Sequence, residues 1–359
     1  MSQHACCSIA PPDLLARLIE EGAPEERAAA VRAMAASASM RTQRALVGRL
    51  ARELDQDVRT LAFMQPAGAG IRQTVYDLEH GGRSQLPGLR ARGAGDPEVE
   101  DKAVNDVYDA TETAYDFYRT VYGRDSVDGH GMELISSVHY GANFDNAFWN
   151  GAQMAYGDGS DKIFKAGALT RSLSVIVHEV THAVTQFTAG LEYSSQSGAL
   201  NEHFSDVFGA LATQYARGQS AAEAEWLIGE ETLAAGLGKA LRSLKDPGDD
   251  EVAGRQPASM SEYRDLPDDS DPANDNGGVH INSGIPNHAF YLAATAIGGN
   301  AWEKAGKVWF QTLTGGKLSP TSGFEQAARA TVEVAGELLG DGGEPEAVES
   351  AWQQVGVLS

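Results

Sequence analysis

A pair of histidines inside an apolar segment constrains this chain more than any other feature. Residues 172–189 read SLSVIVHEVTHAVTQFTA, which is apolar enough for a buried helix and carries His178 and His182 four positions apart. Residues four apart share one helical face about one turn apart, so both imidazoles can reach a single metal ion. Glu179 follows the first histidine and can reach a metal-bound water without binding the metal. The alternative is a buried helix that holds two histidines for packing alone.

A second segment offers a third metal ligand. A catalytic zinc ion takes three protein ligands and keeps one position open, so one ligand must come from elsewhere in the chain. Within residues 197–211, SGALNEHFSDVFGAL, Glu202 and Asp206 share one face of an expected helix, with Asn201 beside them. Burying two carboxylates is costly unless a cation neutralises them, and zinc would do so. Glu202 is therefore the candidate ligand, whereas the alternative, a solvated polar face, is disfavoured by the apolar neighbours.

A third segment, DNGGVHINSGIPNHAFYL at residues 275–292, contains a histidine next to paired glycines. The glycines predict a tight turn that holds the imidazole of His280 at the end of a loop, where Asp275 could orient it. A lone histidine in such a turn is more often structural. Beside the two segments above, His280 becomes a candidate for stabilising the oxyanion of a tetrahedral intermediate.

The beginning of the chain predicts a helical leader and a linker. Residues from about 11 to 60 have leucines at helical spacing and then an excess of Ala, Leu, Arg and Glu. Residues 65–95 are rich in Gly, Pro and Arg, which is typical of surface loops. We therefore expect a domain boundary near Gln65.

The remainder predicts a mixed α/β part and a mainly helical part. Residues 104–122 carry apolar and aromatic side chains at helical spacing. The short aromatic segments MELISSVHYG, NAFWNG and QMAYG, each bounded by Gly or Asn, are typical of strands. After Leu169, helical patterns continue to the C-terminus, interrupted by one irregular acidic stretch at 245–278.

Charge and cysteine content exclude several classes of protein. With 50 acidic and 28 basic residues, the formal net charge of −22 argues against nucleic-acid binding and against adhesion to anionic lipid. No apolar run has the length of a membrane span, and the N-terminal MSQHACCSIAPPDLL lacks the pattern of a conventional signal peptide. The only cysteines, Cys6 and Cys7, are adjacent, a spacing that rarely allows an unstrained disulfide.

Taken together, these segments resemble the thermolysin family of zinc metalloendopeptidases. The resemblance runs from about residue 72 to the end, and the matching segments stand in family order: NAFWNG at 146–151, YGDG at 156–159, HEVTH at 178–182, GLEY at 190–193, SGALNEHFSD at 197–206, LRS at 241–243 and DNGGVHINSGI at 275–285.

The resemblance implies a role for each matching residue. It implies three zinc ligands: His178, His182 and Glu202. Glu179 is implied as the general base, and Asp206 and Asn201 as partners of the ligand imidazoles. The implied oxyanion-stabilising residues are His280 and Tyr193, with Asp275 orienting His280. The implied substrate-binding residues comprise main-chain binders and an apolar pocket for the residue after the scissile bond: Asn146, Ala147, Arg242, Val175, Ile228 and Leu241.

Two departures from the family pattern concern calcium and the leader. Ser174, Thr213 and Leu227 stand where the family places carboxylates of a paired calcium site, so we expect that pair to be absent, with a single calcium elsewhere left open. The leader resembles the short pro-segments of the protealysin-like branch, because residues 9–14 combine apolar side chains with paired prolines. An ordinary helical extension is the alternative.

We predict an α+β, thermolysin-like two-domain fold. Residues 1–65 form the pro-segment and linker, residues 66–190 an α/β domain with an antiparallel sheet that includes the HExxH helix, and residues 191–359 a mainly α-helical domain. The pro-segment is expected to act as an intramolecular inhibitor that keeps the precursor latent. The thiolate of Cys6 or Cys7 could occupy the fourth position on the zinc ion; alternatively, both cysteines are idle.

The predicted function is zinc-dependent endopeptidase activity on protein or peptide substrates, at bonds on the amino side of bulky hydrophobic residues. The alternatives are a latent zinc-binding interaction protein without turnover and a zinc hydrolase that acts on a non-peptide amide. Family resemblance favours secretion by a non-conventional route, with a cytoplasmic location as the alternative.

Overall fold

The computed structural model describes residues 9–35, 70–269, 271–340 and 342–359. Its first helix, α1 (Pro12–Glu21), begins with proline in the first turn, where the missing N–H costs no hydrogen bond. The helix ends at Gly22, and residues 24–35 are helical again. The expected helical leader is thus confirmed over these two stretches, although a break separates them. Residues 36–60 of that prediction lie outside the described residues.

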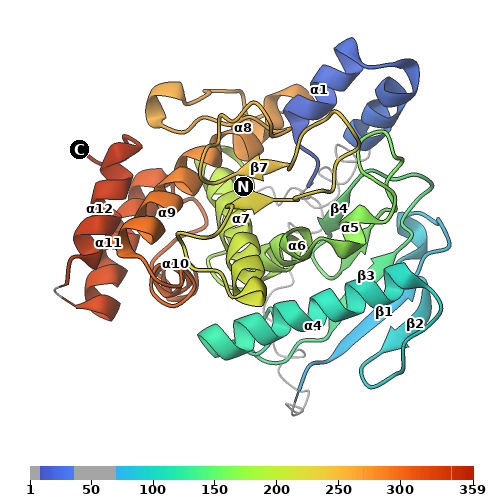
Figure 1. Ribbon diagram of the computed structural model, residues 1–359, viewed down its shortest axis with the longest axis horizontal. Helices are drawn as coiled ribbons and strands as arrows, with labels where there is room; N and C mark the ends of the chain where they lie inside the picture. Colours follow the sequence, from blue (N-terminus) through green and yellow to red (C-terminus); the bar gives the residue numbers. More distant parts are fainter. Residues whose placement is uncertain (1–8, 36–69, 270, 341) are drawn as a thin grey trace.

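A five-stranded sheet forms one side of the molecule (Figure 1). In spatial order β2-β1-β3-β5-β4, its strands are β1 (Gln73–Asp77), β2 (Leu89–Gly93), β3 (Leu134–Val138), β4 (Ala147–Trp149) and β5 (Met154–Tyr156). The three aromatic segments expected to be strands contain β3, β4 and β5. Their short runs of small and aromatic side chains are almost wholly buried, as a sheet covered by helices requires.

The sheet is mixed, which corrects the expected antiparallel arrangement. The pairs β1–β2 and β4–β5 are antiparallel, but β1–β3 and β3–β5 are parallel. Parallel strands need a crossover connection, and helix α4 (Lys102–Tyr122) lies in the connection that leads to β3. As a result, the carboxyl ends of β1, β3 and β5 lie at the same edge of the sheet.

Helix α4 confirms the helix expected at 104–122 and has a defined start and end. The side chain of Asp101 caps its first turn by accepting hydrogen bonds from the backbone N–H groups of Ala103 and Val104. Gly123 ends it in the left-handed conformation, with φ of 69°. The buried face of α4 packs on the sheet and on α6 (Leu173–Gln186) (Figure 1).

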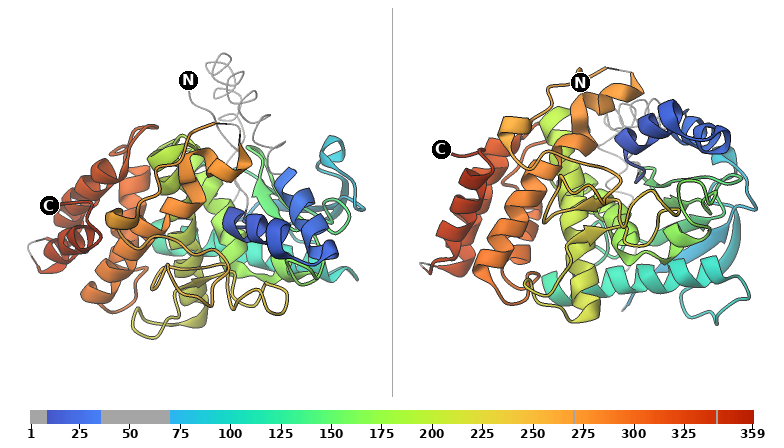
Figure 2. Two further views of the ribbon diagram at one scale, coloured as in Figure 1. Left: turned by 90° about the horizontal axis from the view of Figure 1, so that it is seen from above. Right: turned by 45° about the horizontal axis from the view of Figure 1, so that its top comes forward.

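The C-terminal half is built from helices around α7 (Ser195–Arg217). The other α-helices labelled among the described residues are α5 (Ala168–Arg171), α8 (Asp275–Asn282), α9 (Gly284–Ile297), α10 (Ala305–Thr314), α11 (Phe324–Leu339) and α12 (Glu344–Gln354). Figure 2 shows α9 to α12 stacked on the side of α7 that faces away from the sheet. The two-domain α+β class is therefore confirmed.

The irregular stretch expected at 245–278 begins earlier, where Gly218 ends α7 in the left-handed conformation. From there to residue 274, the described chain contains only two short strands, β6 (Leu227–Ile228) and β7 (Arg242–Ser243), and the short helices η2 (Met260–Glu262) and η3 (Pro272–Asn274). Among the described residues, no helix combines the length and the apolarity needed to cross a membrane.

Candidate metal centre

Helix α6 lies in the interior and presents both histidines of the apolar segment on one face. His178 and His182 are 0% and 2% exposed, and their Nε2 atoms lie 3.0 Å apart. The side chains of α6 from Ser174 to Thr185 are all buried, as the apolar segment predicts. The two imidazoles therefore converge on one point inside the protein.

Glu202 reaches the same point from α7. One carboxylate oxygen, Oε2, lies 3.5 Å from Nε2 of His178, and the other, Oε1, lies 3.4 Å from Nε2 of His182. One ligand atom from each of the three residues lies within 4.8 Å of the others. Oε2 of Glu202 is buried and has no hydrogen-bond partner among the described residues. Two imidazoles and a carboxylate suit zinc, and a shared cation would satisfy this oxygen.

Glu179 lies beside this cluster and is not one of its three donors. It is fully buried, and its Oε2 accepts a hydrogen bond of 2.8 Å from the backbone N–H of Trp149 in β4. The strand thus orients the carboxylate through this backbone N–H. This placement is the one expected of a proton acceptor next to a metal site.

Asp206 holds the ring of His178 from the other side. Its Oδ1 lies 2.9 Å from Nδ1 of His178, which leaves Nε2 to face the cluster. Arg242 donates to both oxygens of Asp206, at 2.9 and 2.7 Å, and Asn287 donates to Oδ2 at 2.9 Å. Burial alone would raise the pKa of Asp206, but Arg242 and His178 outweigh it and hold the pKa far below its usual range. The carboxylate is therefore charged in the folded protein.

His182 has two partners at Nδ1, of which the sequence predicted one. The amide oxygen of Asn201 lies 2.8 Å away, as expected, and the hydroxyl of Ser205 lies 3.0 Å away. Ser205 stands four residues after Asn201 on the same helix face, so helical spacing could have revealed it. No sequence pattern links Asn287 to Asp206, because Asn287 lies on α9, far along the chain from Asp206.

The third histidine also reaches the cluster. The hydroxyl of Tyr193 donates a hydrogen bond to Glu202 and lies 2.9 Å from Nε2 of His280. Asp275 binds Nδ1 of His280 at 2.6 Å and its backbone N–H at 2.7 Å, as an orienting carboxylate would. Gly277 and Gly278, with φ of 81° and 79°, make the turn that brings Asp275 and His280 together.

Carboxylates also set the protonation of His280. Burial lowers its pKa, but the negative charges of Glu202 and Asp275 raise it to about 9. A cation bound to Glu202 would weaken the first of these charges. With Nδ1 tied to Asp275, Nε2 is the nitrogen that can donate a hydrogen bond towards the cluster.

The residues predicted to bind substrate are all buried. Asn146 and Ala147 lie at the start of β4, and the side chain of Arg242 is 2% exposed. The three residues of the predicted apolar pocket are 0% exposed and belong to one hydrophobic cluster: Val175, Ile228 and Leu241. Two of them are joined through the backbone, because the N–H of Leu241 donates to the carbonyl of Ile228 at 2.8 Å.

The beginning of the described chain contacts two of these predicted substrate-binding residues. The N–H of Ile9 donates to the carbonyl of Ala147 at 3.5 Å, and Arg242 donates to the carbonyl of Ile9 at 3.4 Å. Ile9 is fully buried. Pro11 packs against Gly254 so closely that a Cβ at Gly254 would lie 2.8 Å from the Pro11 side chain. The prediction that Cys6 or Cys7 binds the metal lies outside the described residues.

Comparison with known proteins gives consistent matches over nearly the whole chain. Residues 73–186 match the family described as thermolysin metallopeptidase, catalytic domain, and residues 189–357 match thermolysin metallopeptidase, alpha-helical domain. An extracellular metalloprotease of Pectobacterium carotovorum subsp. carotovorum is 42% identical over 363 residues, which cover 99% of this chain and 98% of that protein. A thermolysin of Alicyclobacillus acidocaldarius subsp. acidocaldarius is 40% identical over 304 residues, which cover 81% of this chain and 51% of that protein.

Among solved structures, the precursor of protealysin, a metalloproteinase from Serratia proteamaculans, is similar with a TM-score of 0.82 and 41% sequence identity. The match covers 98% of this chain and 99% of that one. It therefore includes the N-terminal segment as well as the two parts that carry the cluster.

Proposed function

This chain belongs to the thermolysin family of metallopeptidases, and on that basis we propose that His178, His182 and Glu202 hold its one catalytic zinc ion. The chain is a zinc metalloendopeptidase, and its similarity to a precursor structure fits a latent form. The observation that carries the proposed site is the convergence of two imidazoles and one carboxylate on a buried point, with one carboxylate oxygen left without a hydrogen bond among the described residues.

The proposed mechanism assigns each neighbouring group a task. A bound zinc ion supplies Lewis acidity, which acidifies water and polarises the scissile carbonyl. Glu179, oriented by the N–H of Trp149, takes the proton of the attacking water and passes it to the leaving amine. His280 and Tyr193 donate hydrogen bonds to the oxyanion that forms in the transition state.

Removing one ligand tests the zinc site. We expect Glu202→Ala to lose most of its zinc, because two imidazoles alone leave the site incomplete. Zinc per chain, measured by elemental analysis after dialysis, should be lower by about one equivalent in the variant than in the parent. Asp250→Ala, which changes an acidic residue whose side chain is 83% exposed, provides the matched control and should keep its zinc. An unchanged zinc content in Glu202→Ala would exclude this residue as a ligand.

His280 is expected to matter for turnover more than for substrate binding. Substitution His280→Ala should lower kcat by roughly 10²–10³, the range for loss of one oxyanion donor, with a smaller change in KM. His288, a partly buried histidine on α9 that is outside the zinc cluster, serves as the control in His288→Ala. Steady-state kinetics on a short peptide would measure both variants, and full activity of His280→Ala would remove His280 from the mechanism.

We propose that Ile9 inhibits the precursor by imitating a substrate residue. Its N–H and carbonyl bind Ala147 and Arg242, the groups that the family resemblance assigns to the substrate main chain. Its side chain is apolar and fully buried, as that of the residue after a scissile bond would be in an apolar pocket. The same contact supports cleavage on the amino side of bulky hydrophobic residues.

Two ion pairs join the pro-segment to the rest of the chain. Asp13 of α1 pairs with Arg264 at 3.2 Å, and Glu25 pairs with Lys162 at 2.7 Å. These four side chains are well exposed, so each pair adds little to stability and is screened by salt. The buried apolar contacts of Leu14, Leu15 and Leu18 contribute more to holding the segment in place.

We propose that the paired calcium site of the family is absent. The hydroxyl of Ser174 accepts a hydrogen bond from the N–H of Gly229 at 3.0 Å, and that of Thr213 donates to the carbonyl of Gly209 at 2.9 Å. With Leu227, both line a cavity of about 430 Å³, and none of these three side chains offers the carboxylate that a calcium ion would use there. We also propose that the enzyme acts outside the cell, as the name of the Pectobacterium relative states for that protein.

A further inference from the structure

Three polar side chains meet at the edge of the sheet where its parallel strands end. His80 follows β1, His139 comes directly after β3, and Asp158 comes two residues after β5. These strands are neighbours and run parallel, so their carboxyl ends lie side by side. Backbone hydrogen bonds hold the ends together, from Leu78 to Val138 at 3.1 Å and from Tyr140 to Tyr156 at 3.0 Å. Crevices at the carboxyl ends of parallel strands are common ligand sites.

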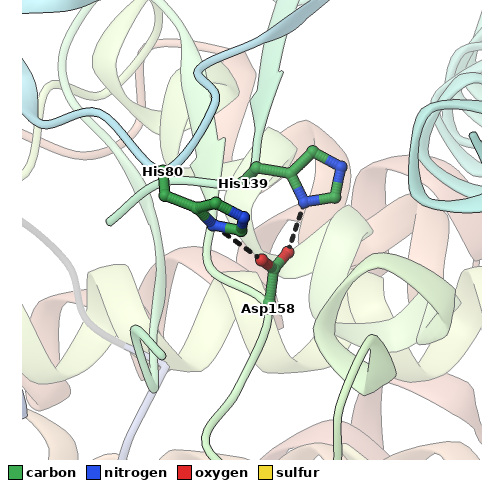
Figure 3. A group of neighbouring side chains, drawn as sticks. All are labelled: His80, His139 and Asp158. Carbon is green, nitrogen blue, oxygen red and sulfur yellow. Dashed lines mark hydrogen bonds and ion pairs between the residues drawn. The ribbon is translucent and has the colours of Figure 1, made fainter. Parts of the chain in front are cut away.

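The two imidazoles point at one carboxylate (Figure 3). Nδ1 of His139 lies 2.7 Å from Oδ1 of Asp158, and Nδ1 of His80 lies 3.3 Å from Oδ2 of the same residue. The ring centroids of the histidines are 5.6 Å apart. One ligand atom from each residue lies within 4.8 Å of the other two. We propose that His80, His139 and Asp158 form a second divalent-metal site, which takes a transition-metal ion of the zinc, nickel or copper class.

His139 is already oriented as a metal ligand would be. Its second ring nitrogen, Nε2, binds Oδ2 of Asp101 at 2.8 Å, and Oδ1 of Asp101 is fixed as the cap of α4. A histidine that gives one N–H to a fixed carboxylate turns its other nitrogen to the metal. His178 at the catalytic cluster has the same arrangement, with Asp206 on one nitrogen and the cluster on the other.

The backbone also holds the histidines in place at a conformational cost. His80 and His139 have φ of 60° and 55°, in the left-handed region that residues other than glycine rarely adopt. Such outliers gather at functional sites, where the surrounding structure enforces them.

The donor set favours a transition metal over calcium. Two imidazoles and one carboxylate suit zinc, nickel and copper, whereas calcium takes oxygen ligands. A second grouping of Asp77, Asp101 and His139 is richer in oxygen. Asp101 already caps α4 and binds His139, and Asp77 accepts a hydrogen bond from the N–H of Glu79, so both carboxylates are engaged. His80, with 59% of its side chain exposed, can move to close the proposed site around an ion.

The test counts bound zinc in the full-length chain. All proteins in the test carry Glu179→Gln, so that they keep the catalytic zinc and do not digest themselves. This parent is compared with a variant that also carries His80→Asn. Asparagine tolerates left-handed φ, and His80 is exposed, so this variant should fold. His130→Asn, at an exposed histidine of the same part of the chain, is the control. Isothermal titration with Zn²⁺ should show one equivalent fewer in His80→Asn than in the parent and the control.

Thermal unfolding supplies a second measurement. Before zinc is added, all three proteins should unfold at the same temperature; added zinc should raise the unfolding temperature less in His80→Asn than in the other two. Equal zinc uptake and an equal zinc-induced shift in the three proteins would overturn the proposal. Loss of a calcium-binding equivalent in His80→Asn would overturn the assignment to a transition metal.

Discussion

Replacing Glu179 by glutamine is expected to lower kcat by roughly 10²–10⁴-fold, the usual contribution of a general acid–base group. The amide keeps the size of the side chain but cannot accept the proton of the attacking water. Zinc should stay bound, because Glu179 lies outside the three-donor cluster. Turnover of a quenched peptide, zinc per chain and circular dichroism together separate loss of chemistry from loss of metal or fold.

A matched variant makes this experiment more specific. Glu202→Gln alters the buried carboxylate that belongs to the three-donor cluster and should lose zinc and turnover together, whereas Glu179→Gln should lose turnover alone. If Glu179→Gln retains wild-type kcat, a different group accepts the proton. If the parent itself shows no turnover after removal of its pro-segment, and both variants are equally inert, the protein binds zinc without turnover.

Release of the pro-segment is expected to produce the second large effect. A tethered segment acts at an effective concentration on the order of millimolar, so a contact with a dissociation constant of about 1 µM leaves about one molecule in 10³ open. A chain cut near residue 70, in the Gly- and Arg-rich stretch of residues 65–95, should then be up to about 10³-fold more active than the intact chain. Activity on a small peptide, with mass spectrometry to confirm that the precursor stays intact, measures this ratio.

Single substitutions distinguish how the pro-segment inhibits. Ile9→Glu places a charge in a fully buried apolar position and should raise the activity of the intact chain. Val31→Glu changes a residue of the same segment whose exposed fraction is 49%, and it should leave latency unchanged. Cys6→Ser with Cys7→Ser tests thiolate ligation separately: unchanged latency in that double variant excludes a zinc-bound thiolate. Full activity of the intact parent contradicts inhibition by the pro-segment altogether.

Spacing along single helices predicted most of the residues that meet at the proposed zinc site. His178 and His182 share a face of α6, and Asn201, Glu202 and Asp206 come from one helix, so a period of 3.6 residues is enough to group them. The same rule would have found Ser205. Asn287 and the contact of Ile9 with Arg242 depend on packing between distant segments, which no local pattern encodes. The domain boundaries near residues 65 and 190 stay predictions.

The group of His80, His139 and Asp158 shows a second limit of local reasoning. Each residue stands alone in the sequence, in a turn after a short strand. They meet only because β1, β3 and β5 run parallel and adjacent, and strand direction was the feature that the sequence did not reveal. Strand segments of three to five residues carry no signal for the direction of their partners, which depends on how α4 and the loops cross the sheet.

Asp206 has a consequence for attempts to alter the specificity of this enzyme. The carboxylate of Asp206 binds His178, Arg242 and Asn287. The same side chain therefore orients both Arg242, which contacts the pro-segment, and His178 of the metal cluster. Substitutions of Arg242 chosen to change the cleavage preference will therefore also change how firmly His178 is oriented. Selection for new substrates through changes at Arg242 therefore also selects on metal affinity. A library that keeps Arg242 and varies the predicted apolar pocket residues avoids this coupling.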